Sequence, residues 1–281
     1  MPAEVSEPRP FRVAADGATL AGEEIGDGPP VLLLHGLTAT RRYVVHGALT
    51  IPRAGYRLIS YDARGHGESG RGADYSYAAL LDDALAVLDD RDVERAAVVG
   101  QSMGAATAAA LAIGHGERVA ALGLVTPAHR GTHARKIDYW DGLADGLDRD
   151  GIDGFLTALE PMSVPEKWRG PVRTVIRQRM ERHADLGAVS AALRGVQRTT
   201  AFDSLDDLAR IGAPTLVVGS RDEVDADHPL AIAEDYAALI PEADLVVEAE
   251  GESPLAWRGG ALSKALLERF AEAGWAPENG D

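Results

Sequence analysis

One serine stands in a setting that could make it a nucleophile. Residues 98–106, VVGQSMGAA, place Gly100, Ser102 and Gly104 in a G-x-S-x-G pattern. An apolar, strand-like run precedes the serine and an alanine-rich helical pattern follows it, which is typical of a sharp strand-to-helix turn that exposes the hydroxyl. The positive end of the helix favours an anion developing there. The pattern predicts a serine for acyl transfer, and a purely structural tight turn is the alternative.

A second loop could stabilise the charge that such chemistry creates. The run VLLLHG ends in His35-Gly36, and its loop would turn towards Ser102 if the two runs are neighbouring strands. The backbone N–H groups of Leu37 and Met103 would then form an oxyanion hole, which stabilises negative charge on a carbonyl oxygen. We interpret His35 itself as a structural histidine that bonds within its loop.

Strand-like runs and helical patterns alternate along most of the chain. Runs rich in Val, Ile and Leu predict buried strands at 31–36, 56–62, 96–102, 119–126, 213–220 and 243–249. Helical patterns lie between or after them, at 76–90, 102–116, 229–240 and 261–274. The first segment favours a hairpin that turns at Asp16-Gly17. This alternation predicts an α/β fold with a doubly wound, mostly parallel sheet.

The alternation stops between about residues 127 and 205. This segment has no strand-like run and carries several helical patterns, one of them rich in arginine. We expect a helical cap at 127–205, inserted between the fourth and fifth parallel strands of a core made of 1–126 and 206–281. The arginines are typical of a solvated helix face, and an anionic substrate is the alternative.

Composition excludes several classes of protein. The 281 residues include 44 acidic and 28 basic side chains, a net charge of −16 that argues against nucleic-acid and anionic-membrane partners. There are no cysteines, which excludes disulfides and thiolate chemistry. The N-terminus lacks the apolar segment of a secretory signal, and no apolar run is long enough to span a membrane. We expect a cytoplasmic protein; a homo-oligomer is compatible with the sequence.

Metal and cofactor motifs are poorly supported. The segment 222–228, DEVDADH, clusters acids with a histidine, but it lacks the glycine turn and terminal glutamate of a calcium loop. The chain has neither a dinucleotide-binding fingerprint nor a phosphate-binding G-x-x-x-x-G-K-[ST] loop. The sequence therefore implies no metal and no organic cofactor.

Five motifs, in order, resemble those of the α/β-hydrolase superfamily: HGLTATRR, YDARGHGES, GQSMG, LVVGSRDEVDADHP and GESPLAW. The resemblance covers roughly residues 10–275 and points to the branch with a helical cap, which includes microbial esterases, lactonases and perhydrolase-like proteins. Family order is nucleophile, acid, histidine. The resemblance implies Ser102 as nucleophile and Asp222 as acid, with Asp225 and Asp227 as nearby substitutes.

The chain departs from the family at the catalytic histidine. Where the family commonly has a Gly-His pair after the last strand, this chain has Gly251-Glu252, and no histidine follows His228. A carboxylate is a weaker base than imidazole, because its ordinary pKa is about 4.3. Glu252 could bond to Asp222 only if one of the two carboxyls were protonated, which would raise one pKa. Glu252 is thus a candidate base, a plain loop residue, or a sign of lost catalysis.

Other histidines could replace the missing base. Catalytic groups in such folds lie on loops at the carboxyl ends of the strands. His129 and His133 follow one predicted strand, and His228 follows another on the loop that carries Asp222. His46 could also approach Ser102, whereas His115 and His183 belong to other parts of the fold.

Three functions remain open. The leading interpretation is a hydrolase of an ester, lactone or thioester that forms an acyl group on Ser102 with a noncanonical base. The substrate would be a small molecule, either an apolar or an anionic acyl compound. The alternatives are a cofactor-free lyase or C–C bond hydrolase, and a catalytically degenerate fold that binds a small ligand.

Overall fold

The computed structural model describes residues 5–132, 136–162, 164–221, 225, 227–252, 257 and 259–277. Its centre is an eight-stranded sheet with strand order β1-β2-β4-β3-β5-β6-β7-β8. The strands are β1 (Arg9–Ala15), β2 (Ala18–Ile25), β3 (Pro30–Leu34), β4 (Arg57–Tyr61), β5 (Ala96–Gln101), β6 (Val119–Val125), β7 (Thr215–Gly219) and β8 (Ala243–Val247). All neighbours from β4 to β8 in this order are parallel. The predicted α/β fold with a mostly parallel sheet is confirmed.

The antiparallel part of the sheet is the N-terminal hairpin. β1 pairs with β2 up to Ala15 opposite Ala18, and β2 pairs antiparallel with β4. The turn between them needs a left-handed residue, which Gly17 supplies with a φ of 75°. The predicted hairpin at Asp16-Gly17 is therefore confirmed.

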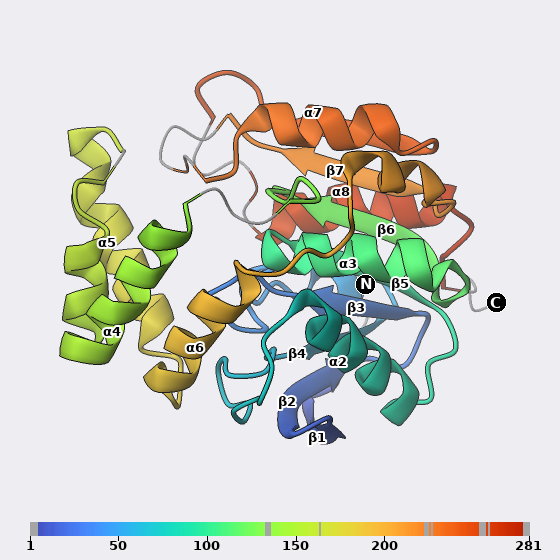
Figure 1. Ribbon diagram of the computed structural model, residues 1–281. Helices are drawn as coiled ribbons and strands as arrows, with labels where there is room; N and C mark the ends of the chain where they lie inside the picture. The colour runs from blue at the N-terminus through green and yellow to red at the C-terminus, as the bar shows by residue number, and fades with distance from the viewer. Residues whose placement is uncertain are drawn as a thin grey trace.

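Helices cover both faces of the sheet (Figure 1). α2 (Tyr77–Asp90), α3 (Met103–Gly114) and α7 (Leu230–Leu239) pack on one face, and α1 (Thr50–Arg53) and α8 (Gly259–Glu272) pack on the other. Two short 3-10 helices span Gly116–Arg118 and Leu205–Arg210. The four helical patterns expected between and after the strands correspond to α2, α3, α7 and α8.

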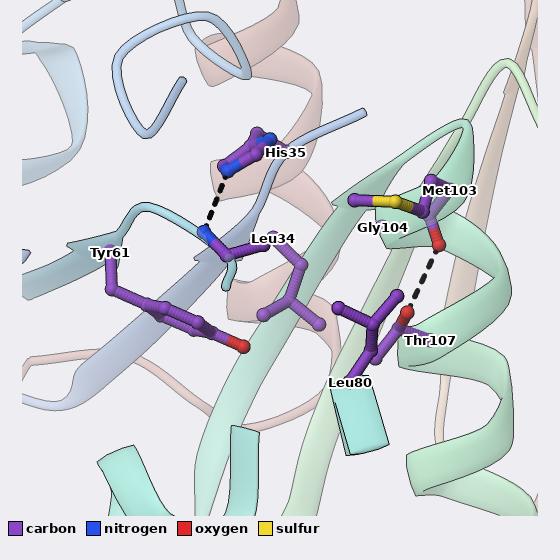
Figure 2. A pocket seen from close by; sticks show the side chains of 8 residues that line it. Leu34, His35, Tyr61, Leu80, Met103, Gly104 and Thr107 are labelled. Atoms are coloured by element: carbon purple, nitrogen blue, oxygen red, sulfur yellow. Dashed lines mark hydrogen bonds between the residues drawn. The ribbon is translucent and has the colours of Figure 1, made fainter. Parts of the chain in front are cut away.

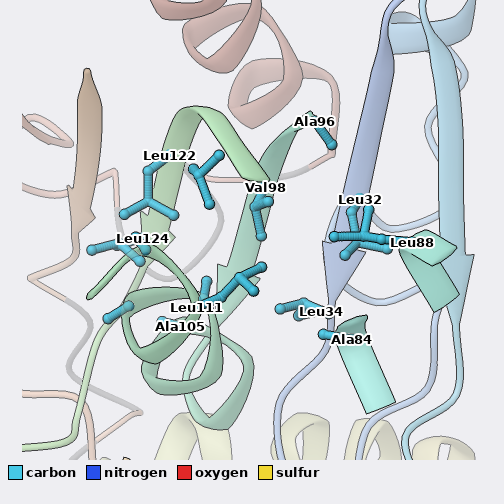
Figure 3. Packing of buried hydrophobic residues seen from close by; sticks show 14 of the residues in the cluster. Leu32, Leu34, Ala84, Leu88, Ala96, Val98, Ala105, Leu111, Leu122 and Leu124 are labelled. Carbon is cyan, nitrogen blue, oxygen red and sulfur yellow. The ribbon is translucent and has the colours of Figure 1, made fainter. Parts of the chain in front are cut away.

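The central strands are apolar on both faces because each face meets helices. In β3, Leu32 and Leu34 pack towards α2 and α3, whereas Val31 and Leu33 pack towards α1 and α8. Figure 3 shows the first of these layers, with Leu32 and Leu34 close to side chains of α2 and α3. This packing fixes the sheet, and hence the positions of the loops at its carboxyl edge.

One predicted strand differs from expectation in its burial. The run at 243–249 was expected to be a buried strand, and β8 is instead half exposed, with Leu245 37% accessible. β8 is the last strand of the sheet and has a neighbour, β7, on one side only. An edge position explains the exposure.

In the described part of the chain between β6 and β7 lie three α-helices, α4 (Ile137–Ala158), α5 (Glu166–Met180) and α6 (Leu186–Val196), followed by the 3-10 helix at Leu205–Arg210. The described residues of 127–205 contain no strand, as predicted. α4 is kinked at Asp150-Gly151. The arginine-rich pattern is divided between α5 and α6, and Asp185 is the N-cap of α6. The three helices share an apolar cluster that includes Leu147, Met180 and Leu193. The assignment of 127–205 as a separate cap domain stays a prediction.

Candidate active site

Ser102 lies in a strained turn between β5 and α3. Its φ of 54° and ψ of −112° are unusual for a residue with a side chain, and such backbone costs on the order of 1–3 kcal/mol. The flanking glycines make the turn feasible. A Cβ at Gly100 would come 2.0 Å from the backbone oxygen of Gly104, and a Cβ at Gly104 would come 2.0 Å from that of Leu34. The expected sharp turn with obligatory small residues is therefore present.

The loop after β3 approaches this turn, as the order of the strands requires. Gly36 lies so close that a Cβ there would be 3.3 Å from the Cβ of Ser102. His35 is buried, its Nδ1 donates to the Gly36 oxygen at 2.8 Å, and its Nε2 accepts the N–H of Ala63 at 2.8 Å. Both ring nitrogens are thus engaged with backbone, which confirms the structural interpretation of His35.

The oxyanion hole of Leu37 and Met103 stays a prediction, and the surroundings of the two residues are compatible with it. Leu37 and Met103 line the same cavity as the serine. Met103 is the first residue of α3, where a backbone N–H has no partner within the helix. Behind the turn is a small cavity of about 10 Å³ among Leu34, His35 and Met103, and there Thr107 donates to the Met103 oxygen (Figure 2).

A histidine of the loop after β7 reaches the serine. The Nε2 of His228 lies 2.6 Å from the Oγ of Ser102, and its Nδ1 lies 2.7 Å from Oδ1 of Asp225. A carboxylate only accepts hydrogen bonds, so Nδ1 carries the proton and donates to Asp225. In neutral His228 the lone pair of Nε2 therefore faces the serine hydroxyl.

The position of this pair follows from its neighbours in the chain. The backbone N–H of His228 donates to the Asp225 oxygen at 3.4 Å, which closes a turn, and Pro229 directly after it is the N-cap of α7. The loop is thus anchored by the helix that follows it, at the carboxyl edge of the sheet where β5 also ends. His228 thus reaches a serine 126 residues away in the chain, and the carboxylate three residues before it holds the far side of its ring.

The electrostatic environment matches this arrangement. Burial by itself lowers the pKa of His228, but the hydrogen bond and charge of Asp225 and the charge of Asp227 outweigh it, and the pKa is raised. Burial raises the pKa of Asp225, and the bond and charge of His228 reverse this to a net lowering. Each group thus favours the charged form of the other, as in an ion pair once His228 gains a proton.

The other predicted bases have different surroundings. Glu252 is exposed, and its carboxylate accepts the backbone N–H of Ala249 at 3.2 Å within its own turn. It is absent from the described lining of the cavity that contains Ser102, so the structure does not bring it to the serine. His129 lines the cavity, but its Nε2 accepts the N–H of Ala201 at 3.2 Å. Asp222 and His133 lie outside the described residues.

Sequence reasoning missed two groups near this site. Glu248, at the end of β8, is buried and accepts hydrogen bonds from the Ser220 hydroxyl at 2.8 Å and the Arg221 N–H at 2.6 Å. It therefore fastens the start of the loop that carries His228. Arg179 of α5 lines the cavity, and its spacing from Val172 and Ile176 on the same helix was the available signal.

The loop beside the oxyanion donors is fastened to the helical insert. His183, between α5 and α6, is buried; its Nε2 donates to the Thr38 oxygen at 3.0 Å and its Nδ1 accepts the N–H of Gly67 at 2.8 Å. Burial lowers the pKa of His183 to about 4, so the ring stays neutral at physiological pH. The insert and the loop after β3 are thus joined by one neutral imidazole.

A cavity of about 1320 Å³ lies over Ser102, between the insert and the core. Its lining includes apolar side chains of the insert such as Trp140, Leu143 and Ile176, together with the polar groups around Ser102. Apolar walls with a few convergent polar groups are typical of a small-molecule site. Among the residues that the structure describes, no group of three or more His, Cys, Asp or Glu side chains could hold a metal.

Residues 29–161, which contain Leu37 and Ser102, match the family described as alpha/beta hydrolase fold. The chain has the α/β-hydrolase fold and resembles that superfamily in sequence. It is an enzyme of the hydrolase type, as several of its relatives are. None of the helices in the described part of this hydrolase is both long and apolar enough to cross a membrane.

Relatives of this hydrolase extend the match to most of the chain. It is 28% identical over 251 residues to a non-heme haloperoxidase of Rhodococcus erythropolis, covering 85% of this chain and 90% of that protein. It is 26% identical to a thermophilic esterase from Thermogutta terrifontis, with a TM-score of 0.77 and coverage of 94% and 99%. The enol-lactonase from Burkholderia xenovorans LB400 shares the fold, at 23% identity, a TM-score of 0.75 and coverage of 93% and 100%.

Proposed function

We propose that the protein hydrolyses a small-molecule ester or lactone by acyl transfer to Ser102, with His228 as general base and Asp225 as its orienting acid. The observation that carries the proposal is the pair of hydrogen bonds at His228: its Nε2 accepts from Ser102 at 2.6 Å and its Nδ1 donates to Asp225 at 2.7 Å. Such a triad is recognised by the contacts from nucleophile to base to orienting acid and by the role of each group, and not by their positions in the sequence.

The first half of the reaction follows from the proton positions. Ser102 Oγ attacks the carbonyl carbon while its proton passes to Nε2 of His228, which becomes an imidazolium beside Asp225. The tetrahedral intermediate places its oxyanion at the N–H groups of Leu37 and Met103. When the intermediate collapses, the carbon–oxygen bond to the leaving group breaks, and His228 gives its proton to the leaving alkoxide. An acyl group remains on Ser102.

Water completes the cycle. His228 removes a proton from a water molecule, which attacks the acyl carbon, and the second tetrahedral intermediate returns the proton to Ser102 as the acid leaves. In a lactone the leaving alkoxide stays attached to the acyl group, so one hydroxy acid is released. A thioester fits the same scheme with a thiol as leaving group. The names of the related esterase and enol-lactonase support esters and lactones as the substrate class.

The proposed base, His228, lies in the loop after β7, whereas the candidate Glu252 lies in the turn after β8. Glu252 would have to give up its bond to Ala249 and reach Ser102, whereas His228 is already within hydrogen-bond distance. Imidazole also suits the role better, since its ordinary pKa lies near neutrality. The exposed position of Glu252 supports its interpretation as a loop residue.

Covalent labelling tests the proposal directly. A fluorophosphonate probe should phosphonylate Ser102 of the wild-type protein, and mass spectrometry of the intact protein and its peptides would locate the adduct. Ser102→Ala should remain unlabelled, and His228→Ala should label far more slowly because the hydroxyl is no longer activated. If folded wild-type protein forms no adduct and hydrolyses no short p-nitrophenyl ester, the site is a ligand-binding remnant and the proposed function is wrong.

A further inference from the structure

The arginines of the helical insert differ sharply in their partners. Arg177 pairs with Asp153, Arg173 with Glu160, Arg194 with Asp145 and Arg198 with Asp141. The side chain of Arg179 forms no ion pair and no hydrogen bond with the residues that the structure describes. It thus lacks the ion pair that these four arginines have.

The side chain of Arg179 is also inside the cavity. It lines the cavity together with Val172 and Ile176, which lie on the same face of α5, and its Nε is buried without a hydrogen-bond partner. The other three described residues with such an atom, Arg41, Asp141 and Arg269, each form an ion pair through another atom. A buried donor without a partner is costly, and the side chain is half-buried and lines the cavity, which indicates that its partner is an anionic group bound in the cavity.

We propose that Arg179 is an anion-binding subsite that holds a carboxylate on the substrate, away from the ester or lactone bond. This inference rests on the proposed function, because it narrows the substrate to a half-ester of a dicarboxylic acid or a lactone with a free carboxylate. A guanidinium binds a carboxylate through two parallel N–H donors, which adds orientation to affinity.

The nearby charges favour a carboxylate over a more highly charged anion. Arg179 is close enough to act electrostatically on both Asp225 and His228, so a ligand bound to it also experiences the negative Asp225. A single negative charge is neutralised by the guanidinium, whereas a phosphate dianion would leave an excess charge beside Asp225. The same proximity places the subsite within the reach of a small substrate whose carbonyl is at Ser102.

Two esters, one with and one without a free carboxylate, distinguish direct binding of the substrate by Arg179 from an effect of Arg179 on Asp225. Wild type, Arg179→Gln and the matched control Arg177→Gln would be assayed on p-nitrophenyl butyrate and on the mono-p-nitrophenyl ester of glutarate. Arg179→Gln should raise KM for the glutarate half-ester roughly 10- to 100-fold, the value of one charged hydrogen-bonded contact, and change KM for the butyrate little. Arg177→Gln should leave both unchanged. Equal losses on both esters would show that Arg179 acts through Asp225 and would overturn the subsite.

Binding of glutarate keeps the test independent of catalysis. Isothermal titration should show glutarate binding to wild type and to Arg177→Gln, and loss of binding in Arg179→Gln. Thermal unfolding checks that Arg179→Gln folds, which we expect because the change removes a half-buried charge that forms no ion pair with the described residues. Absence of glutarate binding in wild type would overturn the inference. Arg179-dependent binding without turnover of any ester would instead sink the proposed function and leave the subsite standing.

Discussion

Two acidic loops end at the same edge of the sheet, and each carries a group that could activate Ser102. In the loop after β7, His228 lies 2.6 Å from the serine hydroxyl and 2.7 Å from the carboxylate of Asp225. In the turn after β8, Glu252 points to solvent and bonds to Ala249 of its own turn. The first loop contacts the serine, and the second faces away from it.

The second loop nevertheless contributes to the first. Glu248 at the end of β8 turns inward and accepts hydrogen bonds from Ser220, Arg221 and Trp257. A buried carboxylate with three donors is a rigid anchor, whereas an exposed carboxylate with one is not. Parallel strands bring several loops to one edge of a sheet. One loop can therefore carry the catalytic residue, while a neighbouring loop holds it in position.

We expect the largest loss of activity when His228 is replaced, because it is the residue that contacts Ser102. His228→Ala should lower kcat on a short p-nitrophenyl ester by on the order of 10⁴ to 10⁶, since deleting a triad histidine in another hydrolase cost about 2 × 10⁶. Glu252→Gln is the matched control and should stay within about threefold of wild type, because an exposed side chain is exchanged for an isosteric one. A large loss in Glu252→Gln with retained activity in His228→Ala would reverse the assignment of the two loops.

Asp225→Asn should have the next largest effect. The amide keeps the shape of the side chain but can donate to Nδ1, which favours the tautomer whose Nε2 carries the proton and cannot accept from Ser102. In trypsin the corresponding change lowered kcat about 10⁴-fold, and we expect a loss of roughly 10³ to 10⁴. Steady-state kcat is the measurement, with Asp227→Asn as control at less than about tenfold. Equal losses in the two variants would contradict the specific role of Asp225.

The pH dependence of activity shows whether the base is the imidazole of His228 or a carboxylate. His228 is a base only when neutral, and its pKa is raised above the ordinary value, so activity should increase with pH through a midpoint above about 6.5. Asp227→Asn removes one of the charges that raise this pKa, so the acid limb of kcat/KM should move to lower pH. If the limb instead had its midpoint near 4, where carboxylic acids ordinarily titrate, a carboxylate and not His228 would be the base.

The fold and half of the site could be predicted because their signals are local. The G-x-S-x-G pattern around Ser102 lies within five residues, and the apolar runs of the strands report burial directly. The partner of Ser102 is 126 residues away and depends on the path of one loop, for which the sequence has no periodic signal. The sequence favours Asp222 over Asp225 as the acid, because the path of the loop decides which carboxylate meets His228. Arg179 was hidden in a series of arginines, four of which pair with acidic side chains on the surface.

The smallest expected effect tests whether the second loop supports the first. Glu248→Gln removes the charge that accepts hydrogen bonds from Ser220 and Arg221, and we expect a loss of about 1–3 kcal/mol in the free energy of unfolding. Because the first loop then begins less rigidly, kcat should fall about three- to tenfold. Urea unfolding and steady-state kinetics on the same preparation are the measurements, with the exposed Glu252→Gln as control.

The contribution of Glu248 to the free energy of unfolding should depend on pH. Burial raises the pKa of Glu248, but its hydrogen bonds with Ser220, Arg221 and Trp257 outweigh this and lower it below the ordinary value of about 4.5. Ionised Glu248 therefore stabilises the fold fully above the unfolded pKa, and this contribution is lost as pH falls through the lowered pKa. The difference between wild type and Glu248→Gln should shrink in that acid range. A constant difference across pH, with unchanged kcat, would mean that the turn after β8 does not hold the loop of His228 in place.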